Sequence, residues 1–317
     1  IGQMYCEKYF PASSKKRMLE IVGNLQTALA QRISEATWMS EPTKAQAKDK
    51  LEHFIVKIGY PDKWKDYTNL VINDSLSLYE NLANIKEYFW IDDLNRKVGK
   101  PVDKTEWLMS PQTINAYYNP TTNEICFPAG ILQPPFFDPE SDDAINYGAI
   151  GAVSGHEMTH GFDDQGCQFD KTGNQRNWWT EADKTAYDKR TKVLEDYFSN
   201  IEVVNGKKIN GKQTLGENIG DNGGLNVALR AMHNAGTAAA EIDGLKADQR
   251  FFLGWARIWA SNNRPEYMDM LLTNDVHSPN IARVNGALPH IDEWYTAFGI
   301  KKSDKLYIPK NKRAHIW

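Results

Sequence analysis

The five residues His156-Glu157-Met158-Thr159-His160 constrain this chain more than any other stretch. Two histidines four residues apart lie on the same face of an α-helix, so their imidazoles can hold one metal ion. Glu157 lies about 100° further round the helix, where it is not an obvious ligand but can reach a water beside the metal. The motif predicts a helix, a zinc site and Glu157 as the general base, although two histidines at this spacing also occur by chance.

A second pair of side chains at helical spacing can supply the missing ligand. Zinc in hydrolases usually has three protein ligands and one open position, so one more His, Glu, Asp or Cys is needed. Glu217 and Asp221 are four residues apart, which predicts one carboxylate on the metal and one behind a ligand histidine. Asp163, one turn after His160, can accept an imidazole N–H in the same way. A helix cap or a solvated charge is the alternative for each aspartate.

Three segments with helical spacing of apolar residues predict helices. Residues 13–38 carry such a stripe behind serines that suit the first turn. Pro42 suits the first turn of a second helix, whose stripe runs on to Ile58 before Gly59 and Pro61 stop it. A third pattern covers residues 76–98. We interpret the first two stripes as core; they consist of Met18, Val22, Leu25, Leu29, Ile33 and Ala36, and of Leu51, Phe54, Ile55 and Ile58.

A hairpin is predicted between these helices and the histidine motif. Residues 115–118 and 124–127 are rich in aromatic and β-branched side chains and flank a turn sequence at residues 119–123. The edge of such a hairpin can pair with an extended peptide, because main-chain hydrogen bonds hold any sequence in register. The following residues 127–139 contain too many prolines for regular structure, and we expect them to wall a cleft.

Bulk properties exclude several classes of protein. A chain of 317 residues with 41% hydrophobic and 25% charged residues has the composition of a globular protein with a core. No stretch is long enough to span a membrane. A net charge of −4 gives no electrostatic reason to bind nucleic acid or anionic lipid. Cys6, Cys126 and Cys167 have no metal-ligand spacing, and we expect buried free thiols.

Further segments spread along the chain complete a recognisable set. They are Trp38-Met39, Thr43-Lys44, Ile58-Gly59-Tyr60-Pro61-Asp62, Val102-Asp103-Lys104, Asn115-Ala116-Tyr117-Tyr118, residues 127–137, Arg264-Pro265-Glu266-Tyr267, Asp275-Val276-His277-Ser278-Pro279 and the last residue, Trp317. Together with residues 156–164 and 216–225, they resemble the C-terminal half of the neprilysin and endothelin-converting-enzyme family of zinc metallopeptidases, whose bacterial members are called PepO. The resemblance covers nearly the whole chain.

The resemblance implies a mainly α (α+β) fold. Its core is a thermolysin-like zincin catalytic domain with a small β-hairpin at a sheet edge, which faces a second, helical domain across a closed cavity. Residues 1–75 are assigned to the second, cavity-capping domain and residues 76–317 to the catalytic domain. One zinc ion per chain is implied, held by His156, His160 and Glu217.

The resemblance also implies roles for side chains around the metal. Glu157, His277 and Asp221 form the catalytic set, in which His277 stabilises the oxyanion of the tetrahedral intermediate. Arg283 holds a substrate carbonyl, and Asn115 and Ala116 bind the peptide main chain. The pocket for the residue just after the cut bond favours large apolar side chains and is implied to contain Ile131, Phe136, Val153, Ile258 and Trp259. For Ile258 and Trp259, ordinary core packing is the alternative.

We therefore expect a zinc-dependent endopeptidase that hydrolyses internal bonds of oligopeptides. Glu157 takes a proton from the attacking water and delivers it to the leaving amine. A non-catalytic peptide-binding protein of the same fold is one alternative, but it would carry a broken ligand or base, and none is broken. An exopeptidase is the other, because Arg283 could fix a free terminus.

The start of the chain at Ile1, without a methionine or a signal-type stretch, indicates a fragment or a processed chain. The resemblance implies that the preceding part of the same chain is its partner. It also favours a bacterial protein of the periplasm, cell envelope or medium over a cytoplasmic one. We expect the stripe of residues 13–38 to pack against the preceding part and to be exposed without it.

Overall fold

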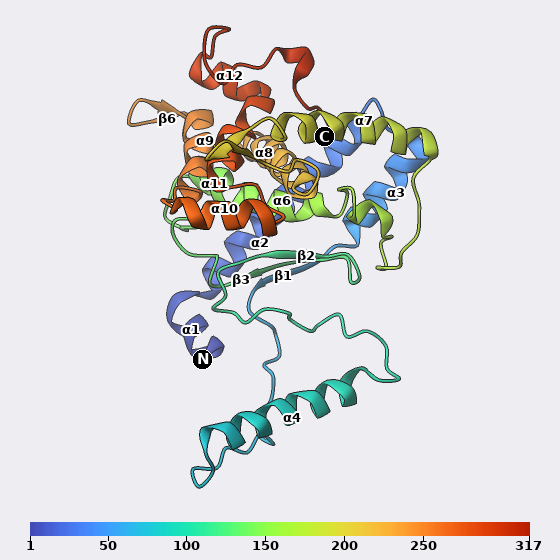
Figure 1. The fold of residues 1–317 in the computed structure, drawn as a ribbon, viewed down its shortest axis with the longest axis vertical. Coiled ribbons are helices and arrows are strands. Elements are labelled where there is room, and N and C mark those ends of the chain that lie inside the picture. The colour runs from blue at the N-terminus through green and yellow to red at the C-terminus, as the bar shows by residue number, and fades with distance from the viewer.

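The computed structural model describes residues 1–317, and two helices packed almost backbone to backbone lie at its centre. They are α6 (Ala152–His160) and α8 (Leu215–Ala235) (Figure 1). A Cβ on Gly224 would lie 2.4 Å from the carbonyl oxygen of Ala152, and one on Gly220 would lie 2.7 Å from Nδ1 of His156. Glycine at these positions lets the helices approach closely enough for side chains of both to share one site.

The first predicted helix is confirmed as α2 (Ala12–Glu35), which packs along α8. The structure differs from the sequence prediction in two respects. Pro11 occupies the N-cap position, and no serine side chain caps the helix. The apolar stripe is buried against this same chain and is not exposed. α1 (Gly2–Tyr9) precedes α2, and its Cys6 belongs to the same hydrophobic core.

The second predicted helix ends early, and its last apolar residues form a strand instead. α3 (Glu41–Glu52) has Pro42 in its first turn as predicted, but Ile55–Gly59 form β1. β1 pairs in parallel with the fully buried β3 (Glu124–Pro128), and the β-branched side chains of β1 prefer this strand pairing to a helix. β2 (Tyr117–Asn119) pairs antiparallel with β3, which confirms the hairpin and leaves β2 at the sheet edge.

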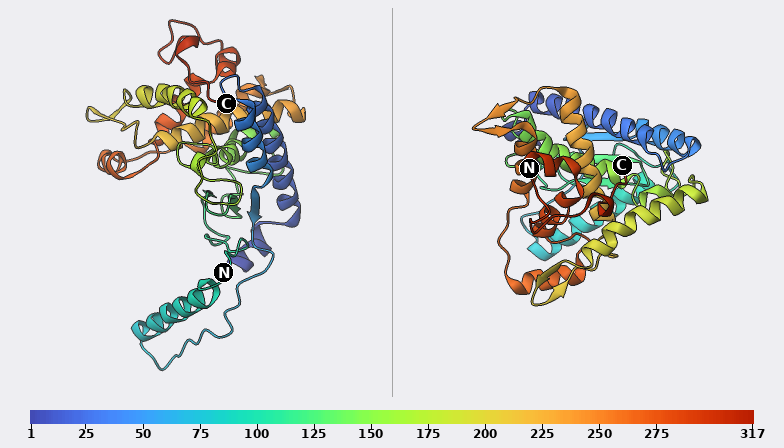
Figure 2. Two further views of the ribbon diagram at one scale, coloured as in Figure 1. Left: turned by 90° about the vertical axis from the view of Figure 1, so that its right-hand side faces the viewer. Right: turned by 90° about the horizontal axis from the view of Figure 1, so that it is seen from above.

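The third predicted helix, α4 (Leu78–Lys97), stands apart from the rest of the molecule (Figures 1 and 2). Ser77 and Glu80 form a capping box at its start, and none of its residues is buried. In contrast, α1, α2 and α3 share the core of α6 and α8. The division of the chain near residue 75 stays a prediction, and in this structure α4 is the helix that lies outside the common core.

The remaining elements surround α6 and α8. They are α5 (Asp143–Asn146) with the π-helical turn Tyr147–Gly151, the 3-10 turn Gly166–Gln168, α7 (Glu181–Phe198), β4 (Glu202–Val204), β5 (Lys207–Lys208), β6 (Glu241–Ile242), β7 (Leu245–Lys246), α9 (Ala247–Ile258), α10 (Pro265–Asn274), α11 (Asn280–Asn285), the 3-10 turn Leu288–His290, α12 (Asp292–Phe298) and the 3-10 turn Lys310–Lys312. The fold is mainly α with one small three-stranded sheet and two short two-stranded ladders. All three cysteines are buried and free, as predicted. None of the helices combines the length and apolarity needed to cross a membrane.

Candidate metal centre and cleft

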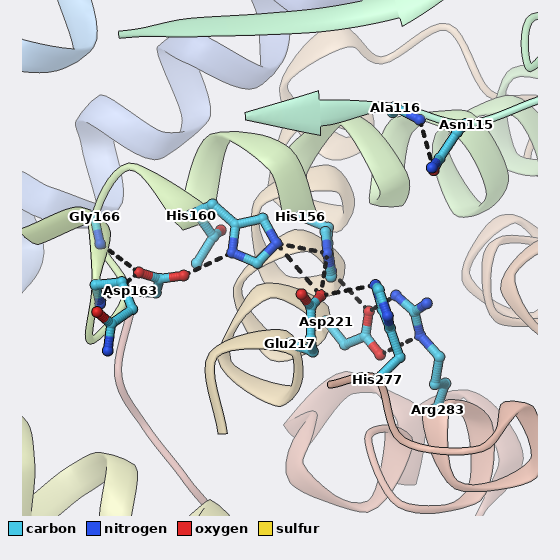
Figure 3. Close-up of polar contacts among 12 residues, drawn as sticks. Asn115, Ala116, His156, His160, Asp163, Gly166, Glu217, Asp221, His277 and Arg283 are labelled. Atoms are coloured by element: carbon cyan, nitrogen blue, oxygen red, sulfur yellow. Dashed lines mark hydrogen bonds and ion pairs between the residues drawn. The ribbon is translucent and has the colours of Figure 1, made fainter. Parts of the chain in front are cut away.

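The three predicted metal ligands converge at one point between α6 and α8 (Figure 3). The Nε2 atoms of His156 and His160 are 2.9 Å apart. Oε2 of Glu217, in the first turn of α8, lies 3.1 Å from Nε2 of His156 and 3.4 Å from Nε2 of His160. Glu157 is not part of this cluster, as its offset on the helix predicted.

Hydrogen bonds behind the two histidines show that this cluster fits a metal ion. Nδ1 of His156 is 2.8 Å from Oδ1 of Asp221, and Nδ1 of His160 is 2.6 Å from Oδ2 of Asp163. A carboxylate accepts a hydrogen bond, so each Nδ1 carries the proton and each Nε2 presents a lone pair. Oε2 of Glu217 is buried and has no hydrogen-bond partner. Three converging lone pairs repel each other unless a cation lies among them, and two imidazoles with one carboxylate are a donor set of catalytic zinc.

The charge balance also favours a cation. Burial alone would raise the pKa of Glu217, but the adjacent imidazoles of His156, His160 and His277 hold it far below its ordinary value. Burial would likewise raise the pKa of Asp221. The adjacent guanidinium of Arg283 outweighs the effect of burial and lowers this pKa below its ordinary value. The acidic side chains of Glu217, Asp221 and Asp163 surround the site, and the one buried guanidinium beside them is that of Arg283. A divalent cation offsets the remaining negative charge.

Arg283 has a partner that the sequence alone did not indicate. Its Nε and Nη2 donate to the two carboxylate oxygens of Asp221, at 2.8 and 2.6 Å, while its guanidinium lies 3.7 Å from the ring centroid of Trp259. Burial would lower the pKa of Arg283, but Asp221 raises it. The guanidinium thus packs against an aromatic ring and pairs with the carboxylate of Asp221, which in turn orients His156. The spacing between Asp221 and Arg283 carries no local signal for this pair.

A cleft of about 290 Å³ opens beside the metal site. Residues of α6, the segment before β2, the proline-rich segment and the α10–α11 region line it. The predicted site residues in its lining are Asn115, Ala116, Ile131, Phe136, Val153, His156, Glu157, Trp259, His277 and Arg283. Ile258 is not in the lining and is buried in the core, which is the alternative considered for it. Of the proline-rich segment 127–139, Phe127 and Pro128 belong to β3, contrary to the prediction, and residues 129–139 contain neither helix nor strand.

His277 is oriented by a residue that sequence reasoning did not single out. Oδ1 of Asp275 accepts hydrogen bonds from both Nδ1 and the backbone N–H of His277, each at 2.9 Å. Nε2 of His277 therefore faces the metal site, 3.2 Å from Oε2 of Glu217. Ser278 anchors this loop to α8 through a 2.7 Å hydrogen bond to Asn218. The Asp-x-His spacing at residues 275–277 was the signal that could have identified Asp275.

The two residues expected to bind the peptide main chain lie directly before β2 at the sheet edge. Oδ1 of Asn115 accepts a hydrogen bond from the backbone N–H of Ala116 at 2.9 Å (Figure 3). Asn115 is exposed and Ala116 is buried. The side-chain oxygen of Asn115 thus fixes the local backbone where Asn115 and Ala116 line the cleft.

Comparisons with known proteins give a consistent result. Residues 115–314 match Peptidase family M13, and residues 1–61 match the N-terminal region of the same family. The neutral endopeptidase of Lactobacillus helveticus is 38% identical over 321 residues, which are 100% of this chain and 47% of that protein. Human endothelin-converting enzyme 1 is 39% identical over 328 residues, which are 100% of this chain and 42% of that protein.

Solved structures show the same likeness. The zinc metalloprotease Zmp1 of Mycobacterium tuberculosis, in complex with an inhibitor, superposes with a TM-score of 0.94 at 44% identity, over 100% of this chain and 49% of that one. PepO from Lactobacillus rhamnosis superposes with a TM-score of 0.90 at 36% identity, over 100% of this chain and 49% of that one. These likenesses confirm the predicted zincin fold. The chain spans about half the length of each of these relatives.

Proposed function

Because this chain belongs to Peptidase family M13, we propose that it carries the catalytic machinery of a zinc-dependent endopeptidase that cuts internal bonds of oligopeptides. The observation that supports this most is the convergence of His156, His160 and Glu217, with Glu157 beside them in the wall of a cleft. Zinc, when bound by these three ligands, would lower the pKa of water and polarise a peptide carbonyl.

Glu157 is proposed as the group that moves the proton. It is nearly buried and lines the cleft next to His156 but lies outside the ligand cluster. Its carboxylate takes a proton from the attacking water and then delivers it to the leaving nitrogen, so a single side chain serves as base and as acid. Both proton transfers therefore have to take place within hydrogen-bond distance of the Glu157 carboxylate.

His277 and Arg283 are proposed to stabilise and position the carbonyl groups of the peptide. Asp275 holds Nδ1 of His277, which leaves Nε2 to donate to the oxygen that becomes negative during attack. Two N–H groups of Arg283 bind Asp221, and its guanidinium carries further N–H groups at the cleft wall. This use of Arg283 speaks against an exopeptidase, because a guanidinium already paired with Asp221 is poorly suited to bind a free carboxylate.

The cleft supports a preference for a large apolar residue just after the cut bond. Ile131, Phe136, Val153 and Trp259 line the cleft beside Glu157, whereas Ile258 does not. Asn115 and Ala116 precede the free edge of β2, where an extended peptide can add its main chain to the sheet. The proposed substrate is therefore an extended oligopeptide. A preceding part of the same chain as partner, and a location in or beyond a bacterial cell envelope, are proposed on the family resemblance.

Metal analysis with cleavage mapping tests the function. We expect one zinc per chain and cuts within a peptide library, mostly before large apolar residues. Removing zinc with a chelator should abolish cleavage, and adding it back should restore cleavage. Full peptidase activity in a metal-free sample would contradict the proposal, and so would release of single terminal residues only. Zinc binding without any cleavage would support the non-catalytic alternative.

A further inference from the structure

The last turn of α3 contains a lysine whose side chain is completely enclosed. Lys50 is 1% exposed, and its Nζ donates to the carbonyl oxygens of Gly161, Gly166 and Phe169, each at 2.7 Å. An ammonium group has three hydrogens, and all three are used. Burial lowers the pKa of Lys50 to about 8, so the ammonium form still predominates at neutral pH.

The three carbonyls belong to the loop that follows the second ligand histidine. Gly161 directly follows His160 and ends α6. Gly166 is the first residue of the short 3-10 turn Gly166–Gln168, and Phe169 directly follows it. The carboxylate of Asp163 lies inside this loop. Its Oδ1 accepts from the backbone N–H groups of Gln165 and Gly166, at 2.9 and 2.6 Å, and its Oδ2 binds Nδ1 of His160. Lys50 thus holds both ends of the loop whose interior orients a metal ligand.

Lys50 is itself held from two other directions. Its backbone carbonyl accepts a hydrogen bond of 3.1 Å from the side-chain amide of Asn123, at the β2–β3 turn. Its Nζ lies 5.7 Å from the ring centroids of both Tyr118 and Phe162, within the range of cation–π attraction. The position of the ammonium is therefore fixed by α3, by the hairpin and by the loop together, and it cannot move without breaking several contacts.

We propose that Lys50 is a positioning residue for the metal site, which fixes the 161–169 loop so that Asp163 holds the His160 imidazole ready for zinc. This inference rests on the proposed function. Lys50 touches neither the metal ligands nor the cleft, so it acts through Asp163 and not on the substrate. Three carbonyl oxygens, and no carboxylate, accept the hydrogen bonds of the ammonium, so the residue restrains three separate backbone positions at once.

Zinc affinity of the intact protein, measured by competition with a chromophoric chelator at pH 7, tests the inference. Lys50→Met removes the three donors and keeps the length of the side chain. We expect it to weaken zinc binding about 10- to 100-fold, the usual effect of losing a group that orients a ligand. Lys48→Met, on the same helix and without a polar partner in the structure, is the matched control and should bind zinc as the wild type does.

A double-mutant cycle separates positioning from a general loss of stability. If Lys50 acts through Asp163, then Lys50→Met should weaken zinc binding by no more than about 3-fold in the Asp163→Asn background. If the fold-losses in zinc affinity of the two single variants multiply in the double variant, the inference is overturned. Unchanged zinc affinity in Lys50→Met would overturn it as well. Near-ultraviolet circular dichroism of the metal-free variants establishes that each one is folded.

Lys50→Arg replaces Lys50→Met in the same cycle if the methionine variant does not fold. It keeps a buried cation but shifts its donors, and the same coupling with Asp163→Asn is expected. If the fold-losses in zinc affinity of Lys50→Arg and Asp163→Asn multiply in the double variant, the inference is again overturned. Failure of the proposed function would look different, because the wild-type protein would then bind no zinc or cut no peptide, whatever residue stands at position 50.

Discussion

At the scale of single residues, α6 places the two histidines of the metal site apart from Glu157, the proposed group for proton transfer. His156 and His160 point at the metal site, whereas Glu157 lies outside the ligand cluster and in the cleft wall. We therefore predict that Glu157→Gln retains one zinc per chain while turnover falls by at least about 10²- to 10⁴-fold, the range for loss of a general acid–base group. Zinc content and peptide hydrolysis are measured on the same preparation. Loss of zinc from this variant would make Glu157 a ligand and contradict the assignment.

A residue-scale prediction of pH dependence concerns His290, which lies far from the metal ligands in sequence. Burial lowers its pKa to about 4, and His315 and Arg313 add to this effect. Its Nδ1 accepts a hydrogen bond from the backbone N–H of Ala314 at 3.0 Å, so the native state requires the neutral ring. In the unfolded chain, the imidazole of His290 takes up a proton near its ordinary pKa of about 6.5. In the folded chain it stays neutral at this pH.

The free energy of unfolding should consequently fall as the pH drops from about 6.5 toward 4, by up to about 3 kcal/mol from this residue. His290→Gln cannot titrate and keeps an acceptor for Ala314. The difference between wild type and variant in urea unfolding, recorded at several pH values between 4 and 7, isolates the contribution of His290. Parallel stability curves for the two proteins would show that His290 does not titrate in this way.

At the scale of elements, the close approach of α6 and α8 is what builds the metal site. A Cβ on Gly224 would lie 2.4 Å from the carbonyl oxygen of Ala152 and 2.6 Å from the backbone nitrogen of His156, and backbone atoms cannot move aside as a flexible side chain can. Gly224→Ala should therefore push the helices apart, lower stability by about 1–3 kcal/mol and weaken zinc binding, because Glu217 moves away from the histidines.

Gly23→Ala is the matched control for this prediction. Gly23 lies in the interior of α2, where an added Cβ meets no atom within 4 Å. Alanine is the better helix former, so this variant should gain about 0.5–1 kcal/mol and keep its zinc affinity. Urea unfolding and chelator competition on both variants decide the matter. Equal zinc affinity in Gly224→Ala and wild type would show that the helix separation does not set the site.

At the scale of the whole molecule, α4 lies outside the common core. None of its residues is buried, and Leu78, Tyr79 and Trp90 are more than half exposed. An apolar surface of this kind is normally covered, and we propose that the preceding part of a longer chain covers it. The structure buries the stripe of α2 internally, so this proposal places the partner on α4 and not on α2.

Limited proteolysis tests this division of the molecule. In the chain as described, a protease should cut within residues 60–77 and 98–114, on both sides of α4, because these segments contain no regular secondary structure. The pieces before and after α4 should stay associated through α2, α8 and the β1–β3 pairing. Release of residues 1–75 as a separate folded unit would support the boundary predicted from the sequence instead.

The sequence by itself determined the features that depend on short spacing along the chain. Four-residue spacing on a helix placed His156 with His160 and offset Glu157, and the turn between two β-rich runs predicted the hairpin. The helix predicted from apolar spacing was wrong at residues 55–59, because the same apolar residues lie in a strand that pairs with β3. A periodic pattern records which side chains are buried, but not which neighbour buries them.

Only the tertiary structure decided the groups that support the site from a distance. Asp221 was expected behind a ligand histidine, but only the structure shows that this histidine is His156, across 65 positions. Arg283 meets Asp221 across 62 positions, and Lys50 reaches the loop after His160 across more than 110. No local spacing encodes these contacts, because they exist only after α2, α3, α6 and α8 have packed into one core. The sequence therefore specified which side chains can bind a metal, and the packing of helices far apart in the chain decided which groups hold those side chains in place.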